Sequence, residues 1–253
     1  MVSKNFIKKT VCIMPMAGKG TRFKKLGNNI HKPLIKVDGK PMFIKSSETF
    51  SKFYKWIFIA PKNIKHEKSF IDSLSSFKNK KLILIKKTTA GQASTVYKAR
   101  KILKKNQLII IHSCDLKFNF TLKELITKIK KYDILVFTAK CNKFHIKNHK
   151  QFSWVKKSDV ENEIIISCKS NFKNNKRKNR VLIGSFVFKN KQIFTRSANY
   201  VFKNKFKINN EYYLDTVAAK AKKLGYKVGE ISVKNYISWG TYSEFLNYQI
   251  MKN

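Results

Sequence analysis

Small residues and an arginine follow directly on an apolar run near the start of the chain. Residues 11–14 are apolar, and the stretch after them contains Ala17, Gly18, Gly20, Thr21 and Arg22. Glycines let a backbone approach a ligand closely, so that successive N–H groups point at an anion. Arginine adds a planar cation with several hydrogen-bond donors. The stretch predicts a phosphate-binding loop at the end of a buried strand, and an ordinary tight turn is the alternative interpretation.

Two common glycine loops are excluded by the spacing. A P-loop has four residues between its glycines and a Lys-Ser or Lys-Thr after the second, whereas one residue separates Gly18 from Gly20. A dinucleotide-binding loop has a third glycine close to the position of Phe23. The loop therefore belongs to another type of phosphate-binding site.

A second short motif follows the glycine loop in the same register. It consists of Lys32, Pro33 and Leu34, and residues 37–42 then read VDGKPM. Together with the glycine loop, this pattern resembles the sugar-phosphate nucleotidyltransferases, in particular the short members that serve capsule and surface polysaccharides. The resemblance extends over residues 10–248, with His31 where the family often has a proline. It implies that backbone amides at residues 17–21 and Arg22 bind the departing phosphates, and that Lys32 neutralises the α-phosphate.

Composition places the chain among globular proteins. It has 253 residues, of which 43% are hydrophobic, and no apolar run is long enough to span a membrane. The four cysteines are far apart, which favours reduced thiols and a cytoplasmic protein. His145 and His149 are expected at the surface, because no third metal ligand lies near them.

The charge of the chain is strongly positive. Fifty-five basic and 14 acidic residues give a net charge of +41. Such a charge favours binding to nucleic acids and other polyanions and attracts nucleoside triphosphates. The lysines are spread over the whole chain, and the densest cluster, residues 173–180, lacks interleaved aromatic residues. We therefore expect a solvated loop there, no specific nucleic-acid partner and no membrane partner.

Apolar runs alternate with helical patterns through the first part of the chain. Strands are expected at residues 11–14, 56–60, 82–85, 108–111 and 134–138, with helical segments between them. This order predicts an α/β fold of three layers, with a doubly wound, mostly parallel sheet. We expect one domain over residues 1–253, with a nucleotide-binding part at about 1–140 and an acceptor-binding part with a small β insertion at about 141–253. The loops after Met14, Ile85 and Ile111 should then face one crevice.

The loop after residue 85 contains Gly91 and Gln92. By resemblance, backbone amides of this turn contact the nucleobase. A plain helix start, with Gly91 close to the N-cap, is the alternative interpretation.

An aspartate follows the buried run at residues 108–111. Asp115 is one of only 14 acidic residues, and carboxylate oxygens suit a hard cation. By resemblance, Asp115 binds the Mg²⁺ that bridges the nucleotide phosphates. The alternative is that Asp115 only caps the following segment.

The second half of the chain resembles the acceptor-binding part of the family. Lys169 falls at the position of a lysine that contacts the acceptor phosphate, and Gly184 opens a strand that lies against the acceptor. Cys168 replaces a glutamate that often binds a sugar hydroxyl, and Ser238 replaces an aspartate that often supplies a second metal ligand. Asp215 or a water molecule could substitute for that aspartate, or Asp115 and the triphosphate could hold the metal alone.

The sequence therefore predicts an enzyme that transfers a nucleoside monophosphate to a phosphorylated acceptor and releases pyrophosphate. The acceptor is a sugar 1-phosphate or a small phospho-alcohol, and Mg²⁺ is the expected cofactor. One alternative is a noncatalytic nucleic-acid or polyanion-binding protein on the same fold. Another is a nucleotide-sugar glycosyltransferase, which would normally carry a D-x-D metal motif that this chain lacks. Neither the base nor the oligomeric state is predicted.

Overall fold

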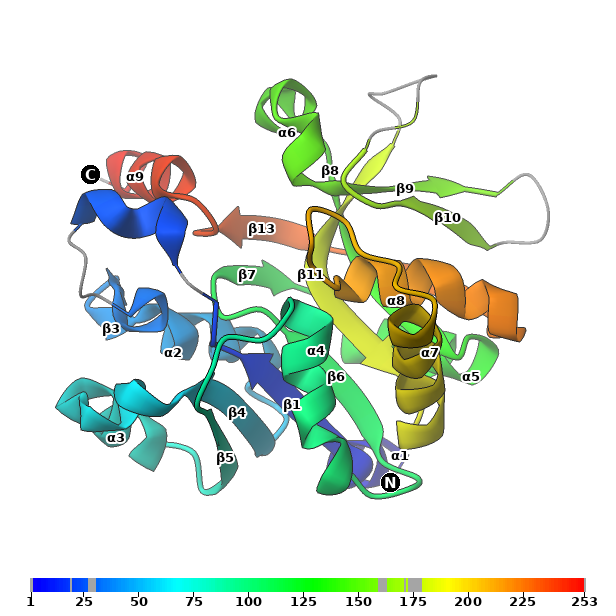
Figure 1. Ribbon diagram of the computed structural model, residues 1–253, viewed down its shortest axis with the longest axis horizontal. Coiled ribbons are helices and arrows are strands. Elements are labelled where there is room, and N and C mark those ends of the chain that lie inside the picture. Colours follow the sequence, from blue (N-terminus) through cyan, green and yellow to red (C-terminus); the bar gives the residue numbers. More distant parts are fainter. Residues whose placement is uncertain are drawn as a thin grey trace.

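The computed structural model describes residues 2–18, 20–26, 31–158, 163–170, 172 and 179–252. A large twisted sheet forms its centre, with helices on both faces (Figure 1). The expected loop at residues 173–180 falls mostly outside the described residues. No helix in the described part of the chain is long and apolar enough to cross a membrane.

The sheet combines a parallel half with a mixed half, in which β12 runs parallel to β8 and the other pairs are antiparallel. The parallel strands are β1 (Thr10–Pro15), β4 (Lys55–Pro61), β5 (Asn79–Ile85) and β6 (Leu108–His112). The remaining strands are β8 (Ile134–Lys140), β9 (Ser153–Lys157), β10 (Ile164–Ser167), β11 (Arg180–Phe188) and β12 (Val228–Ser232). Their order is β10-β9-β11-β6-β1-β4-β5, and β8 pairs with both β11 and β12. The predicted α/β fold is confirmed.

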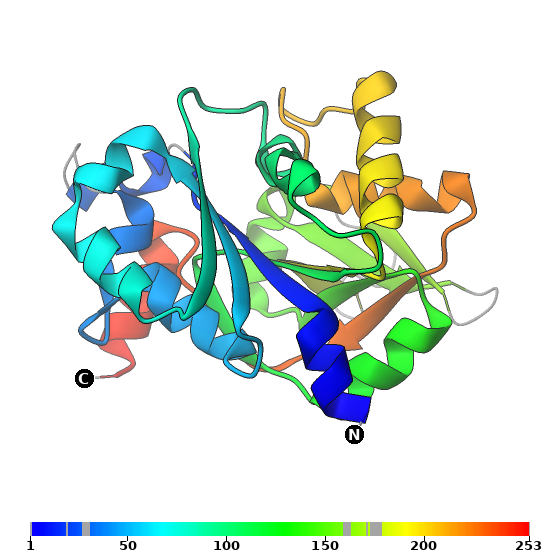
Figure 2. The ribbon, with the colours of Figure 1, turned by 90° about the horizontal axis from the view of Figure 1, so that it is seen from below.

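Alternation along the strands divides the core between the two faces of the sheet. In β1, Val11 and Ile13 pack on one face, whereas Cys12 and Met14 pack on the other. The first face is covered by α4 (Gln92–Tyr97), α7 (Lys191–Lys203) and α8 (Leu214–Ala221). The second face is covered by α1 (Val2–Lys9), α2 (Met42–Ser47), α3 (Lys68–Ser75) and α5 (Leu122–Lys131). Figure 2 shows α7 (yellow) and α8 (orange) together on one side of the sheet.

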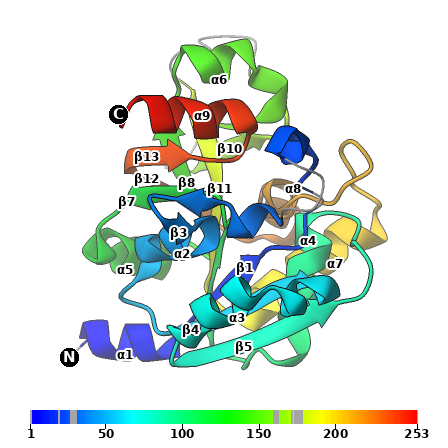
Figure 3. The same ribbon diagram turned by 90° about the vertical axis from the view of Figure 1, so that its left-hand side faces the viewer.

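A third, smaller core cluster joins the C-terminal helix to the first part of the chain. Phe23 of the 3₁₀ helix η1 (Thr21–Leu26) packs with Trp239 and Phe245, the latter from α9 (Tyr242–Ile250). The hairpin of β2 (Lys36–Val37) and β3 (Lys40–Pro41) contributes Val37 to the same cluster. A separate ribbon pairs β7 (Leu116–Asn119) with β13 (Lys234–Ser238), and Figure 3 shows α9 in red beside β13. This cluster brings the C-terminal segment next to the glycine loop.

Some elements differ from the sequence-based expectations. The long helix α7 was not predicted, although its buried residues Ile193, Ala198 and Val201 lie on one face. Helix α8 begins at Leu214, with Tyr213 as its N-cap residue. The surface position expected for His145 is wrong. His145 lies at the start of α6 (Lys143–Lys147), where it completes a capping box with Asn142 and is buried.

Candidate active site

The carboxyl ends of the parallel strands lie at one edge of the sheet. Residue Ile13 of β1 pairs with Ile111 of β6, so the loops that follow these strands leave the sheet side by side. β11 runs antiparallel to β6 and pairs Ser185 with His112, which brings Gly184 to the same edge. One cavity of about 850 Å³ opens there. The predicted crevice at the ends of β1, β5 and β6 is therefore present.

All the predicted site residues line this cavity. They are Ala17, Gly18, Gly20, Thr21, Arg22, Lys32, Gly91, Gln92, Asp115, Lys169 and Gly184. Lys19, which belongs to the predicted amide loop, lies outside the described residues. The fold thus brings together residues from six separate segments of the chain.

The glycine loop is fixed at both ends. Its first amide, Met16 N, donates to Ile59 O of β4 at 2.7 Å, and Phe23 N donates to Gly20 O at 2.9 Å where η1 begins. Gly20 has a φ of +62°, a conformation that residues with a Cβ rarely adopt. A Cβ on Gly18 would meet no atom within 4 Å, so the space over this glycine is open to a ligand.

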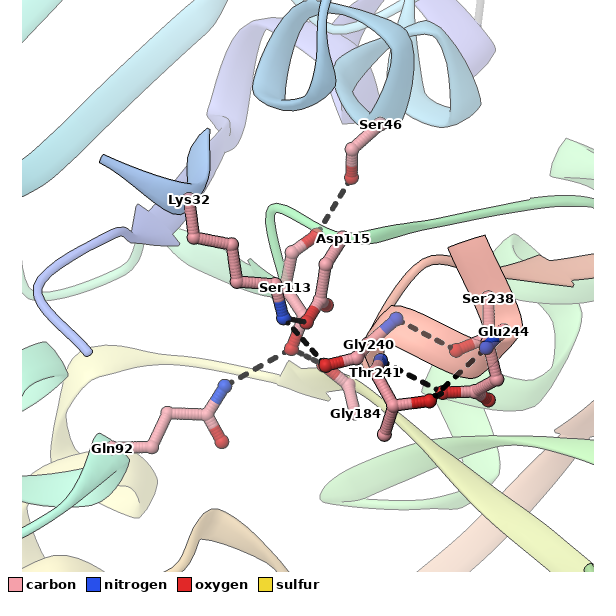
Figure 4. Close-up of polar contacts among 10 residues, drawn as sticks. All are labelled: Lys32, Ser46, Gln92, Ser113, Asp115, Gly184, Ser238, Gly240, Thr241 and Glu244. Carbon is pink, nitrogen blue, oxygen red and sulfur yellow. Dashed lines mark hydrogen bonds and ion pairs between the residues drawn. The ribbon is translucent and has the colours of Figure 1, made fainter. Parts of the chain in front are cut away.

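Lys32 and Asp115 form the central charge pair of the cavity. Lys32 Nζ lies 2.5 Å from Asp115 Oδ2 and donates to Gly240 O at 2.9 Å (Figure 4). Burial alone would raise the pKa of Asp115, but the charge of Lys32 and its hydrogen bond, with a contribution from Arg22, hold the pKa below its usual value. Asp115 is therefore a carboxylate at neutral pH.

A hydrogen-bond network holds the end of β6 and the residue that follows it, just before Asp115 in the chain. His112 is fully buried and lies between Ser185 Oγ, 2.7 Å from Nδ1, and Ser46 Oγ, 2.9 Å from Nε2. Ser46 Oγ also donates to Ser113 O at 2.6 Å. Burial lowers the pKa of His112 to about 4, so the ring is neutral and structural.

Ser113 connects Gln92 at the start of α4 to Gly184 of β11. Its Oγ accepts from Gln92 Nε2 at 3.1 Å and donates to Gly184 O at 3.0 Å. A Cβ on Gly184 would lie 2.9 Å from Ser113 Oγ, so this position requires glycine. The side chain of Gln92 is thus held by the protein itself, which leaves backbone groups of this loop for a ligand.

The turn at Gly91 is held against a second loop. Tyr212 N donates to Ala90 O at 2.8 Å, and Ala93 N donates to Tyr212 O at 3.0 Å. Gly91 has a φ of +109°, and a Cβ there would lie 2.6 Å from both Tyr212 N and Tyr212 O. Gly91 therefore stands at the N-cap of α4, as the alternative interpretation proposed, and it also lines the cavity.

Lys169 lies at the other end of the cavity. Its Nζ donates to Gln151 O at 2.8 Å and lies 4.8 Å from the centroid of the Tyr213 ring. Its backbone N donates to Ser153 Oγ, and that hydroxyl donates to Asp215. The carboxylate of Asp215 in α8 thus accepts from Ser153 of β9 at the end of the cavity near Lys169, whereas the carboxylate of Asp115 accepts from Lys32.

Several cavity residues were not identified from the sequence. They include Gln151, Asn209, Asn210, Glu211, Tyr213, Tyr236 and Glu244. Asn209 and Asn210 have φ values of +50° and +61° and form a two-residue turn between Ile208 and Glu211. Adjacent asparagines between two strand-like residues are typical of such a turn, so this feature was detectable.

The donors around Asp115 suit a hard divalent cation. The Asp115 carboxylate and the Gly240 carbonyl are oxygen ligands of the kind that Mg²⁺ prefers. Among the described residues, no group of three or more His, Cys, Asp and Glu side chains is placed to hold a metal ion. A cation here would therefore need oxygens from a substrate or from water as well.

A second cavity of about 600 Å³ adjoins the first at Ala17, Gly18 and Thr88. The basic residues on its wall are His31, Lys62, Lys65, His66, Lys86 and Lys87. The four lysines among them bring positive charge next to the glycine loop, which favours the approach of polyanions such as triphosphates.

This chain resembles known proteins both in its sequence and in its fold. Residues 12–230 match the family model described as nucleotidyl transferase. A nucleoside-diphosphate-sugar pyrophosphorylase from Vibrio cholerae RC9 superimposes with a TM-score of 0.77 at 16% identity, over 94% of this chain and 98% of that one. An inositol-1-phosphate CTP transferase from T. maritima superimposes with a TM-score of 0.71 at 16% identity, over 96% and 94%. No curated protein sequence is a significant match.

Proposed function

This chain belongs to the nucleotidyl transferase family, and from that premise we propose that it transfers a nucleoside monophosphate to a phosphorylated acceptor. The observation that carries the proposal is the cavity in which the glycine loop, Arg22, Lys32 and Asp115 meet. These groups bind and neutralise phosphates. They match a reaction in which alignment and charge neutralisation supply most of the catalysis.

The reaction is a displacement at the α-phosphorus of a nucleoside triphosphate. An oxygen of the acceptor phosphate attacks this phosphorus, and the bond to the oxygen that bridges the α and β phosphates breaks. Pyrophosphate leaves with the electron pair. Because the acceptor phosphate is already an anion at neutral pH, the protein needs neither a nucleophilic side chain nor a general base.

The cavity residues have separate tasks in this reaction. The amides of the glycine loop and Arg22 hold the β and γ phosphates, and Lys32 neutralises the α-phosphate. Gly91 and its neighbours lie against the nucleobase, whereas Lys169 binds the acceptor phosphate and Gly184 leaves room for the acceptor. Asp115 would hold Mg²⁺, and the bound ion would neutralise charge on the phosphates.

The acceptor is a sugar 1-phosphate or a small phospho-alcohol of surface polysaccharide synthesis. Two similar folds support these classes, since one is named a nucleoside-diphosphate-sugar pyrophosphorylase and the other an inositol-1-phosphate CTP transferase. Cys168 stands where the resemblance expects a glutamate for a sugar hydroxyl, which favours an acceptor with fewer hydroxyl groups. We place the reaction in the cytoplasm, where nucleoside triphosphates are available.

Pyrophosphate release tests the proposal directly. The four ribonucleoside triphosphates and dTTP are each incubated with Mg²⁺ and a panel of sugar 1-phosphates and phospho-alcohols. We expect release with one triphosphate and one class of acceptor. If triphosphates bind but no pair reacts, and nucleic acids bind with a steep salt dependence, the noncatalytic alternative is correct instead.

A further inference from the structure

The aromatic ring of Phe23 lies against the ammonium group of Lys32. Lys32 Nζ is 5.0 Å from the centroid of this ring, which is within the range of cation–π contacts. Phe23 directly follows Arg22 in η1, and its side chain is buried whereas that of Arg22 is exposed. The end of the glycine loop therefore supplies an electron-rich surface to the charge pair of the cavity.

Phe23 is itself fixed by the C-terminal helix. Its ring makes edge contacts with the rings of Phe245 and Tyr242 in α9, at centroid distances of 6.1 Å and 6.4 Å. Its backbone N donates to Gly20 O at 2.9 Å. Helix α9 packs along η1, and Figure 1 shows α9 in red beside the blue helical segment that contains Phe23. The ring is thus held on both its backbone side and its outer edge.

Three groups surround the ammonium of Lys32. They are the Asp115 carboxylate, the carbonyl oxygen of Gly240 and the ring of Phe23. Trp239 N donates to Asp115 O at 2.7 Å, so the same C-terminal segment also fixes the backbone at Asp115. Because a lysine carries its charge on a flexible four-carbon stem, these neighbours determine where the charge lies.

We propose that Phe23 is a positioning residue for Lys32, an inference that rests on the proposed function. When Lys32 binds the α-phosphate instead of Asp115, the ring remains against the ammonium and keeps it between the glycine loop and the loop after β6. A lysine held in this way loses less side-chain freedom when it binds the phosphate. Phe23 thereby tightens the binding of the triphosphate, and it acts through Lys32 alone.

Fluorination of the Phe23 ring tests the inference, because fluorine withdraws electron density from the ring face with little change in ring size. Phenylalanine with one, two or three ring fluorines is placed at position 23 of the whole chain by amber-codon suppression. Calorimetric titration with each of the four ribonucleoside triphosphates and dTTP, in the presence of Mg²⁺, then gives the Kd.

We expect the Kd of the triphosphate that binds to rise with each added fluorine, by about 2- to 30-fold in total. This range corresponds to cation–π contacts at exposed and at desolvated sites, and the Lys32 side chain, which is 16% exposed, lies between these limits. A residue that only fills the core would show no such graded response, since the ring keeps its shape.

Two controls isolate the contact between the ring and the ammonium. Lys32→Met removes the charge, so fluorination of Phe23 in this background should leave the Kd unchanged. The same fluorinated residues at Phe186, which is fully buried in β11 and lies away from the cavity wall, report the general effect of fluorine in the core. They should also leave the Kd unchanged.

The possible failures are distinguishable. A Kd that stays constant along the series, or that rises equally in Lys32→Met or at position 186, overturns the role of Phe23 and leaves the proposed function in place. A falling Kd overturns it as well, because the ring would then hold Lys32 only in the free protein. If Lys32→Met binds the triphosphate as tightly as the unchanged protein, or if none of the five triphosphates binds, the proposed function is wrong too.

Discussion

Lys32 Nζ lies 2.5 Å from Asp115 Oδ2, although 83 positions separate the two residues in the chain. The pair joins the segment after the glycine loop to the loop after β6. Without a ligand, the ammonium group of Lys32 neutralises the negative charge of the Asp115 carboxylate. In the proposed reaction Lys32 binds the α-phosphate instead of Asp115. The divalent cation that accompanies the substrate would then neutralise the Asp115 carboxylate.

Removal of the charged groups tests the proposed catalytic roles. We expect Arg22→Ala, Lys32→Ala and Asp115→Ala each to lower the rate of pyrophosphate release by at least a factor on the order of 10²–10³, the cost of losing one preorganised stabilising group. Steady-state kinetics with the substrates found in the panel measure this loss. Lys36→Ala, an exposed lysine outside the cavity, serves as the control. Full turnover in all three cavity variants would contradict the assignment.

Two glycine variants distinguish a structural from a ligand-binding role. Gly91→Ala should lower the free energy of unfolding by about 1–3 kcal/mol, because of its φ of +109° and the backbone of Tyr212 at 2.6 Å. Gly18→Ala should leave stability within about 0.5 kcal/mol, since no atom lies within 4 Å of its Cβ, yet it should weaken triphosphate binding. Chemical denaturation and a triphosphate titration measure both effects. If the two variants were equally stable, the close approach of the Tyr212 backbone would not restrict position 91 to glycine.

The buried His112 makes stability depend on pH. Its pKa is about 4 in the folded protein and roughly 6.5 in the unfolded chain. The unfolded chain therefore binds a proton that the folded protein does not, and stability falls as the pH drops from about 6.5 towards 4. Between pH 7 and pH 5 this one group should remove about 2 kcal/mol from the free energy of unfolding.

His112→Asn should remove the part of this stability loss that His112 causes. Urea unfolding at pH 7 and pH 5 measures the difference. The variant should still lose some stability at acidic pH because of His145, whose pKa burial also lowers to about 4. His66→Asn, the same substitution at an exposed position, provides the control. If His112→Asn lost as much stability between pH 7 and pH 5 as the unchanged protein, the His112 ring would not be held neutral in the folded state.

Lys169 should act on the acceptor and not on the nucleotide. Its ammonium lies at the far end of the cavity, on Gln151 O and over the Tyr213 ring. Loss of one charged hydrogen bond should raise the acceptor KM roughly 10- to 100-fold in Lys169→Ala, with little change in the KM of the triphosphate. Initial rates with each substrate varied in turn separate the two constants. A rise in the triphosphate KM alone would place Lys169 in the other half of the site.

Local patterns were sufficient for the strands in the first half of the fold. The strands of the parallel half have apolar runs bounded by loops, and the glycine loop has a distinctive spacing. The helix α7 was missed although its buried residues lie on one face, so its periodicity was available in the sequence. His145 was misplaced because a capping role and burial depend on neighbours that the local pattern does not show.

The sequence by itself determined which residue types could bind phosphate and a hard cation, and in which segments they lie. Only the tertiary structure decided that Lys32 pairs with Asp115 and that Ser113 connects Gln92 to Gly184. Periodicity and propensity report on neighbours a few residues apart. Contacts between residues 21 to 83 positions apart, such as these, depend instead on strand order and register, which the whole chain fixes when its core packs.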